Sequence, residues 1–302
     1  MEVGMIGLGR MGGNMTQRLI NGGHKVTVYD PKEDAVRSLV EKGAVGTFTL
    51  TEFTSKLTTP RVVWMMVPSG TTTENMIEAL ANELSLGDIV VDGGNSNYKE
   101  SIHRARKLAK KGITMLDVGT SGGIWGLKEG YCLMIGGERE AFEKLEPVFK
   151  TLAPAADRGY GYVGLSGAGH FVKMVHNGIE YGLMESYAEG FELLVAKDDF
   201  KLEIKQIAEL WRYGSVVRSW LLDLIAEALR ENPNLEGISA YVEDSGEGRW
   251  TAQEAIELGV PLSAITQALT TRFRSRQQQP LASRLLAVMR QKFGGHAVKK
   301  QN

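Results

Sequence analysis

The chain has 302 residues, of which 43% are hydrophobic and 24% charged, a composition typical of a globular protein long enough for two domains. Its 35 basic and 36 acidic residues leave a net charge of -1, which gives no overall reason to expect a nucleic-acid or membrane partner. No apolar run reaches the roughly 18 residues that cross a bilayer, and the start shows no signal-peptide pattern. The single cysteine, Cys132, has no disulfide partner and no zinc-type neighbours. We therefore expect a metal-free, cytoplasmic protein in which Cys132 is a buried apolar residue.

Short β-branched or apolar runs alternate with amphipathic stretches through about residue 163. The expected strands are 3–8, 25–29, 61–67, 88–92, 114–118 and 131–135. Strands that alternate with helices predict βαβ units and a mostly parallel, doubly wound α/β sheet. The Gly- and Ala-rich segment 153–169 ends this pattern, and we place the domain boundary there, with 1–165 as one domain and 166–302 as the next.

The second domain is expected to be all-helical. Apolar residues recur at spacings of three and four from Phe171 through Val175, Ile179 and Leu183 to Tyr187, which predicts a helix reaching about residue 196 and measuring roughly 45 Å. A helix of that length suggests contact with a second domain or a second subunit. Later periodic segments predict further helices at 202–212, 214–229, 251–258, 261–275 and 280–292.

A glycine-rich loop, GLGRMG at 7–12, follows the first expected strand and precedes a helical pattern. In a dinucleotide-binding Rossmann domain such glycines permit a tight turn, a close approach of the pyrophosphate and close helix packing. Asp30 ends the second expected strand, where a carboxylate accepts hydrogen bonds from the adenosine ribose and repels a 2′-phosphate. The sequence therefore predicts NAD as the preferred cofactor. Lys32 could meet a 2′-phosphate and keeps NADP open as an alternative.

Two more glycine-rich loops, at 92–96 and 117–123, follow expected strands. Ligands of open parallel sheets bind beyond the carboxyl ends of the strands, so both loops could reach the nicotinamide, although ordinary turns explain either loop equally well. The expected cofactor-binding residues are Gly7, Leu8, Gly9, Arg10, Met11, Gly12, Asp30, Lys32, Val67 and Asn95.

The helix that begins the second domain carries an unusual group of polar residues. Lys173, Asn177, Glu180 and Tyr181 project from one side of it, with His176 beside them. In a dry cleft the lysine can act as a general base and the glutamate as a general acid. The alternatives are a solvated face with a Lys-to-Glu contact, which the apolar neighbours disfavour, and a metal at His176 and Glu180, which the lysine charge disfavours.

These motifs resemble those of the decarboxylating 6-phosphogluconate dehydrogenases, within the β-hydroxyacid dehydrogenase superfamily. The resemblance rests on GLGRMG, on DGGNS at 92–96, on TSGG at 120–123 and above all on GHFVKMVHNGIEYG at 169–182. It implies oxidative decarboxylation of 6-phosphogluconate to ribulose 5-phosphate and CO2, the pentose phosphate pathway reaction, by a short-form, NAD-preferring enzyme. The acid at the end of the second strand replaces the Asn-Arg pair typical of NADP-using members.

The resemblance also implies residue roles. Lys173 would take the proton of the C3 hydroxyl and later polarise the ketone, and Glu180 would protonate C1 of the enediol. Arg290 and His296 would be contributed by the C-terminal tail to a neighbouring subunit, so the chain is expected to form a homodimer or a higher homo-oligomer. The implied substrate-binding residues are Asn95, Ser121, Gly122, Gly123, His176, Asn177, Tyr181, Arg272, Arg290 and His296.

The sequence departs from the family where phosphate is usually bound. The family pattern KGTGKWT reads SGEGRWT at 245–251, so Glu247 replaces a threonine. Either Glu247 turns away, or Arg249 compensates, or the distal end of the substrate differs. The main alternative is a 3-hydroxy acid dehydrogenase for an unphosphorylated acid such as hydroxyisobutyrate, which Arg272, Arg290 and His296 disfavour. A catalytically silent NAD sensor would not need Lys173 and Glu180.

Overall fold

A computed structural model describes residues 1–299. The chain divides into two compact units, Met1–His176 and Asn177–Asn302, and the division falls inside the long helix α8 (Ala168–Ala196). The domain boundary predicted from the sequence lies after residue 165, just before α8 begins. That boundary remains a prediction. Across the described residues, no helix combines the length and the apolar character that crossing a membrane requires.

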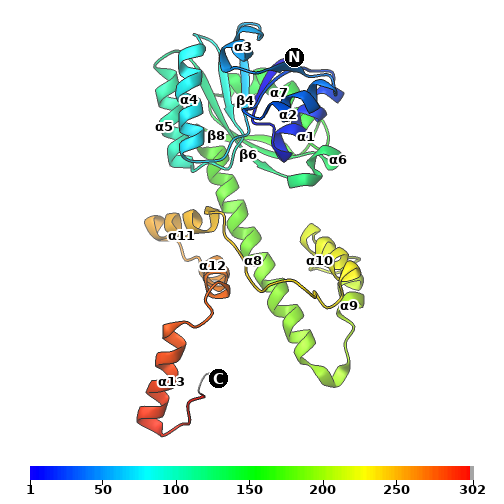
Figure 1. Cartoon of the computed structure of the whole chain (residues 1–302), viewed down its shortest axis with the longest axis vertical. Helices are drawn as coiled ribbons and strands as arrows, with labels where there is room; N and C mark the ends of the chain where they lie inside the picture. The colour runs from blue at the N-terminus through cyan, green and yellow to red at the C-terminus, as the bar shows by residue number, and fades with distance from the viewer. Residues whose placement is uncertain (300–302) are drawn as a thin grey trace. The chain divides into compact units, whose positions relative to one another are not determined.

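An eight-stranded sheet forms the centre of the first unit, with the strand order β3-β2-β1-β4-β5-β6-β7-β8 within the described residues (Figure 1). All neighbouring strands run parallel except β6 and β7, which are antiparallel. The mostly parallel, doubly wound sheet is thus confirmed. The strands are β1 (Glu2–Ile6), β2 (Lys25–Tyr29), β3 (Val45–Thr47), β4 (Val62–Met65), β5 (Ile89–Asp92), β6 (Thr114–Ser121), β7 (Cys132–Gly136) and β8 (Tyr160–Gly164).

Strands β3 and β8 were not expected from the sequence. β3 has only three residues, too few for a periodic pattern, and β8 lies in the Gly- and Ala-rich segment interpreted as a boundary. Cys132 is also different from expectation, because it is exposed. It is the first residue of β7, and only the four residues after it are buried.

Helices cover both faces of the sheet because alternate strand residues point to opposite faces. In β4, Val62 and Trp64 join one buried cluster, whereas Val63 and Met65 join the other. The first cluster includes side chains of α1, α2 and α7, and the second includes side chains of α3, α4 and α5. These helices are α1 (Arg10–Asn21), α2 (Glu33–Val40), α3 (Leu50–Ser55), α4 (Thr71–Glu83), α5 (Tyr98–Ala109) and α7 (Arg139–Leu152), with the short α6 (Gly126–Glu129) before β7.

The second unit is helical, as predicted. After α8 its helices are α9 (Ile204–Trp211), α10 (Trp220–Glu231), α11 (Glu247–Leu258), α12 (Ser263–Ser275) and α13 (Leu281–Gly294). α10 begins six residues later than the periodicity suggested, because Ser219 caps it by accepting a hydrogen bond from the Leu222 backbone at 3.1 Å. Before that cap the chain turns at Gly214, whose φ is 71°.

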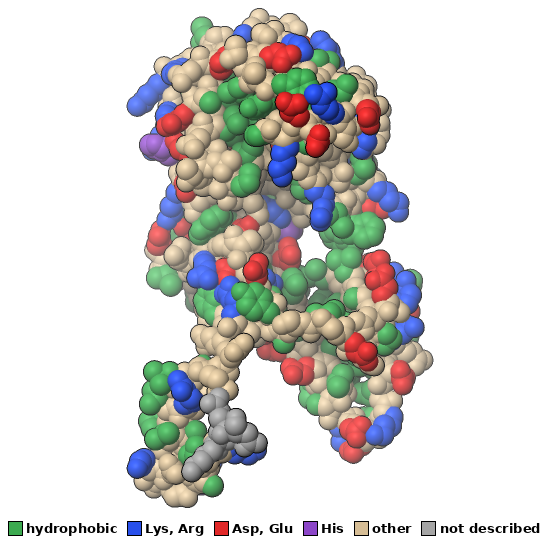
Figure 2. Space-filling model, viewed as in Figure 1, with side chains coloured by type: hydrophobic (Ala, Val, Ile, Leu, Met, Phe, Trp, Pro, Cys, Tyr) green, Lys and Arg blue, Asp and Glu red, His purple; other side chains and the backbone are tan. Residues whose placement is uncertain are grey.

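The second unit has little buried core of its own. Its described clusters are small, one around Tyr181 and Leu269 and one around Ala226 and Leu229. α13 has no buried residue, and hydrophobic side chains lie on its surface (Figure 2). The exposed apolar residues of α13 are Leu281, Leu285, Leu286, Val288, Met289 and Phe293.

Candidate cofactor and substrate site

Most residues predicted to bind the cofactor, together with Ser121 of the predicted substrate site, lie at one edge of the sheet. The glycine loop follows β1, Asp30 follows β2, Val67 lies just beyond β4, Asn95 follows β5 and Ser121 ends β6. These five strands are neighbours and run parallel, so their carboxyl ends meet at the same edge. The chain winds outward in opposite directions from β1 and β4, which makes this edge the topological switch point where such sheets bind ligands.

The glycine loop has the geometry that a pyrophosphate needs. Gly7 has a φ of 86°, and a Cβ at Gly12 would lie 1.9 Å from the Gly7 carbonyl oxygen. These two glycines are therefore required by the turn and by the packing of α1 on β1. A Cβ at Gly9, by contrast, would meet nothing within 4 Å. Gly9 caps α1 without a side chain, so this open space lies beside the N–H groups that begin the helix, as a dinucleotide requires.

The Asp30 carboxylate is held in place by the backbone. One oxygen accepts a hydrogen bond from the Leu8 N–H at 2.7 Å, and the other accepts one from the Lys32 N–H at 2.8 Å. Each carboxylate oxygen can still accept from a second donor. The carboxylate is thus fixed against the glycine loop with acceptor capacity left for ribose hydroxyls.

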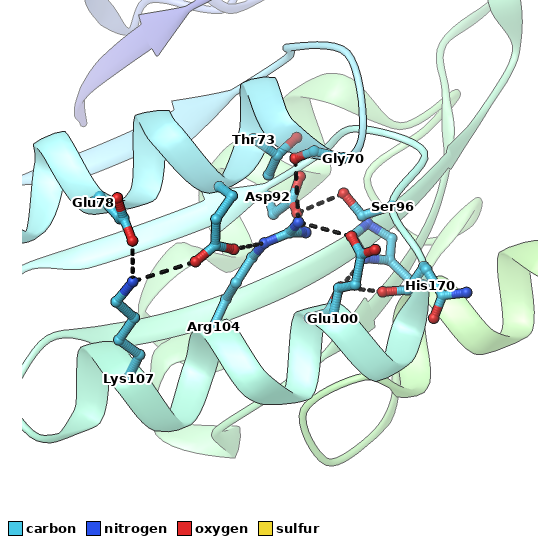
Figure 3. Close-up of polar contacts among 12 residues, drawn as sticks. Gly70, Thr73, Glu78, Asp92, Ser96, Glu100, Arg104, Lys107 and His170 are labelled. Carbon is cyan, nitrogen blue, oxygen red and sulfur yellow. Dashed lines mark hydrogen bonds and ion pairs between the residues drawn. The ribbon is translucent and has the colours of Figure 1, made fainter.

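A buried arginine that the sequence analysis missed contacts both the loop after β4 and the end of β5. Arg104 of α5 is 2% exposed and donates to Glu74 at 2.9 Å, to Glu100 at 2.7 Å and to the Gly70 carbonyl at 3.4 Å (Figure 3). Gly70 belongs to the loop after β4. The sequence pattern of α5 gave no sign of this role for Arg104, because an arginine on an amphipathic helix usually marks the solvent side.

Asp92 performs a similar task for the loop that carries Asn95. One of its oxygens accepts from the Gly94 N–H at 3.1 Å and the other from the Ser96 hydroxyl at 2.8 Å. Asp92 is fully buried, and an Arg104 nitrogen lies 3.9 Å from it. The loop therefore has a defined path, which leaves Asn95 exposed at its tip.

Lys173 lies near His176 and Ser121 within the first unit. It is only 7% exposed, and its Nζ is 3.5 Å from His176 Nδ1. His176 Nε2 in turn is 3.5 Å from the Ser121 hydroxyl. Gly122 and Gly123 follow Ser121 with φ values of 129° and 50°, so glycine is needed at both. An amine, an imidazole and a hydroxyl thus gather where β6 ends, suitable for binding a polyhydroxy acid.

The other polar residues of α8 belong to the second unit. Asn177 and Tyr181 are buried, with 9% and 6% exposure, and Glu180 is half-buried. The Arg272 guanidinium stacks on the Tyr181 ring at 3.5 Å from its centroid and donates to the Glu243 carbonyl at 3.0 Å. These contacts bring two of the residues predicted to bind phosphate together.

The segment 245–251, where the sequence differs from the family's phosphate-binding pattern, forms defined hydrogen bonds. The Ser245 hydroxyl donates to the buried Glu247 carboxylate, and the Ser245 N–H donates to the Tyr181 hydroxyl at 3.4 Å. Arg249 donates two hydrogen bonds to Asp244, at 2.7 and 3.0 Å. Glu247 is therefore satisfied locally, and Arg249 has a different carboxylate as its partner.

The tail residues stand apart from these contacts. Arg290 lies in α13 and His296 just after it, and both are exposed. Neither forms an ion pair with any other residue in the range 1–299. The same range holds no group of three or more His, Cys, Asp or Glu side chains placed to bind a metal.

Comparisons with known proteins identify the family. Residues 2–164 match the NAD binding domain of 6-phosphogluconate dehydrogenase, and residues 169–301 match the C-terminal domain of the same enzyme. The chain belongs to the 6-phosphogluconate dehydrogenase family. The sequence-based resemblance is thereby confirmed.

Individual relatives agree with this assignment. The chain is 41% identical, over the full length of both, to the NAD(+)-dependent, decarboxylating 6-phosphogluconate dehydrogenase of Haloferax volcanii. It is 42% identical, again over both full lengths, to the Bacillus subtilis protein YqeC, which is described as a 6-phosphogluconate dehydrogenase only provisionally. The solved Plasmodium falciparum 6-phosphogluconate dehydrogenase, studied with NADP+ and with 6-phosphogluconate, matches with a TM-score of 0.83 and 26% identity. That match covers all of this chain and 66% of the Plasmodium chain.

Proposed function

We propose that the protein oxidises and decarboxylates 6-phosphogluconate to ribulose 5-phosphate and CO2, with NAD as its preferred cofactor. The observation that carries the proposal is the buried Lys173 of α8, which lies beside His176 of the same helix and near Ser121 at the end of β6. β6 belongs to the sheet whose first strand leads into the glycine loop. A lysine held among groups that bind hydroxyls fits a reaction that begins with removal of a hydroxyl proton. Family membership supports the same reaction.

In this proposal Lys173 takes the proton of the C3 hydroxyl. NAD, which the glycine loop and Asp30 would hold, would supply the acceptor for the hydride that leaves C3. The resulting β-keto acid then loses CO2, and protonated Lys173 stabilises the negative charge that develops on the ketone oxygen. Asn95, Ser121 and His176 would orient the sugar acid through its hydroxyls and carboxylate, together with Gly122, Gly123 and Asn177.

Glu180 completes the cycle as the general acid. It lies seven residues after Lys173 on the same continuous helix, which is about two turns, so both groups face the same side of α8. Loss of CO2, with transfer of the Lys173 proton to the ketone oxygen, leaves an enediol. Glu180 then delivers a proton to C1 while Lys173 takes back the enediol hydroxyl proton, which gives ribulose 5-phosphate. Glu180 is then ionised and must regain a proton before the next turnover.

The phosphate would be bound by Arg272 and Tyr181. The Tyr181 ring holds the guanidinium by stacking, so Arg272 is oriented before the substrate arrives. The buried Glu247 is already bonded to Ser245, which supports an arrangement in which it does not face the phosphate. We propose that Arg290 and His296 add to this phosphate site from a neighbouring subunit of a cytoplasmic homo-oligomer.

Substrate comparison tests the proposal. Initial rates should be measured with 6-phosphogluconate, gluconate and 3-hydroxyisobutyrate, each with NAD and with NADP, while CO2 release is followed in parallel. We expect turnover and equimolar CO2 with the phosphorylated acid only. Oxidation of 3-hydroxyisobutyrate without CO2 would instead support the unphosphorylated-acid alternative.

Variants of the two proposed catalytic residues test the roles. Lys173→Met should lower kcat by about 10²–10⁴-fold, because a positioned general base contributes about that much, while NAD binding is retained. Glu180→Gln should lower the rate of ribulose 5-phosphate formation by a similar factor. Lys144→Met and Glu140→Gln, exposed positions of α7, are matched controls that should keep wild-type kcat.

A further inference from the structure

The first turns of α8 rest directly on the backbone of β6 and β7. A Cβ at Gly119 of β6 would lie 2.4 Å from the Lys173 Cβ and 2.7 Å from the Gly169 carbonyl oxygen. A Cβ at Gly169 would lie 2.2 Å from the Asp117 carbonyl oxygen, and one at Gly136 would lie 2.6 Å from the Gly169 nitrogen. No side chain therefore separates the helix from the two strands at these points.

The Asp117 side chain binds the start of the same helix. Its carboxylate is 1% exposed, and its two oxygens accept from the Gly167 N–H at 2.6 Å and from the His170 N–H at 2.9 Å. N–H groups at the start of a helix have no partner within it, and a carboxylate there is also favoured by the helix dipole. Asp117 and Gly119 are two residues apart on β6, so they present the same face to α8.

The His170 side chain fixes the helix start from the other side. Its Nδ1 is 2.7 Å from the Ser101 hydroxyl of α5, and that hydroxyl also donates to the Asn97 carbonyl at 3.2 Å. Ser101 thus links the His170 ring to the Asn97 residue that caps α5. The start of α8 is held to β6 and to α5, and Lys173 lies three residues beyond His170.

We propose that Gly119 is a positioning residue for Lys173: its missing Cβ and the Asp117 carboxylate together set how close the Lys173 amine lies to the end of β6. The catalytic consequence rests on the proposed function, whereas the positional claim does not. The φ of Gly119 is not positive, so the backbone tolerates a side chain there. Only the contact with α8 demands glycine.

The first test is Gly119→Ala. The added methyl group must push Lys173 and the helix backbone away from β6. A displacement of about 1 Å at a catalytic group costs roughly 10²-fold in rate, so kcat should fall by about that factor. The glycine loop after β1 is untouched, so the Kd for NAD should stay at its wild-type value. Gly161→Ala is the matched control. A Cβ at Gly161 of β8 would meet nothing within 4 Å, and the φ of Gly161 is not positive.

The single cysteine supplies a readout that needs no turnover. Cys132 is exposed as a residue, but its thiol is partly desolvated, and this raises the thiol pKa. The nearby Lys173 ammonium lowers that pKa in part. The pH midpoint of Cys132 alkylation therefore reports the position of the Lys173 charge. Gly119→Ala should move this midpoint upward, in the same direction as Lys173→Met and by less, whereas Gly161→Ala should leave it unchanged.

The outcomes are separable. Wild-type kcat in Gly119→Ala, or a loss of kcat with an unchanged alkylation midpoint, would overturn the positioning role. If the wild-type protein fails to turn over 6-phosphogluconate, the alkylation measurement still decides the positional claim, and the proposed function fails separately. Should Gly119→Ala not fold, Asp117→Asn replaces it. An amide has one acceptor oxygen for the Gly167 and His170 N–H groups, so the midpoint of Cys132 alkylation should again move upward. An unchanged midpoint contradicts the proposal.

Discussion

At the scale of single residues, Asp30 carries its negative charge at a fixed place, because the Leu8 and Lys32 N–H groups hold both oxygens. A 2′-phosphate would have to approach this charge, and like-charge juxtaposition costs several kcal/mol. Asp30→Ser should therefore lower the ratio of kcat/KM with NAD to kcat/KM with NADP by about 10–100-fold. Steady-state rates with each cofactor measure the ratio. Glu33→Gln is the control, since Glu33 is a nearby exposed acid paired with Arg37, and a comparable change there would show that net charge alone sets the preference.

Asp30 and the glycine loop could be predicted from the sequence because their roles follow from local spacing: a loop after one strand and an acid at the end of the next. Asp117 and Arg104 could not. Asp117 acts on N–H groups about 50 residues later in the chain, and Arg104 joins Glu74, 30 residues earlier, to the loop that contains Gly70. Such contacts exist only after the strands have taken their order in the sheet.

At the scale of elements, Asp244 joins two helices of the second unit. It accepts from Arg249 in the first turn of α11 and, at 2.8 Å, from Arg276, which directly follows α12. The hydrogen bond from Arg249, with a further one from Arg276, lowers the pKa of the Asp244 carboxyl to about 2. The carboxylate is 2% exposed, but Arg249 is 50% exposed, so solvent screens part of this interaction.

Asp244→Asn should therefore lower Tm at neutral pH by roughly 2–4 °C, the effect of about 1 kcal/mol in a protein of this size. A depressed pKa stabilises the folded state above the pKa of the unfolded chain, and this contribution is lost as pH falls toward about 2. The Tm difference between the variant and the wild-type protein should thus be constant above about pH 5 and shrink below about pH 4. Thermal unfolding monitored between pH 7 and pH 3 gives the comparison; a difference that stays constant below pH 4 would contradict the role of this ion pair.

Helices and strands whose hydrophobic residues recur at a regular spacing were predicted well, and those without such a spacing were not. β2 matches its expected range, and α8 begins three residues before the first residue of its apolar pattern. β3 and β8 take their place in the sheet through pairing with β2 and β7, which a short or glycine-rich segment does not reveal in its own sequence. α10 was extended too far because Val216 and Val217 continue the apolar pattern although both are exposed in the loop before Ser219.

At the scale of the whole molecule, the middle of the apolar stripe that predicted α8 is exposed within the described residues. Ile179 is 52% exposed and Leu183 is 47% exposed, although both stand at core-facing positions of the pattern. Exposed apolar residues along α8 and α13 are expected where subunits meet. Unfolding should therefore depend on protein concentration, with Tm rising as the concentration rises, and sedimentation should give a homo-oligomer. A monomer at micromolar concentration with an unchanged Tm would contradict this expectation.

Hybrid oligomers decide whether the tail acts on its own subunit or on its neighbour. Lys173→Met and the double variant Arg290→Ala/His296→Ala should each be inactive as pure oligomers. If the tail completes a neighbouring site, a mixed dimer contains one site with both defects and one site with neither, so co-refolding the two variants should restore about a quarter of wild-type activity. If the tail serves its own subunit, every site in the mixture carries a defect and no activity returns. The control is a mixture of Lys173→Met with Glu180→Gln: both changes lie on one helix of one chain, so their mixed dimers should stay inactive in either arrangement.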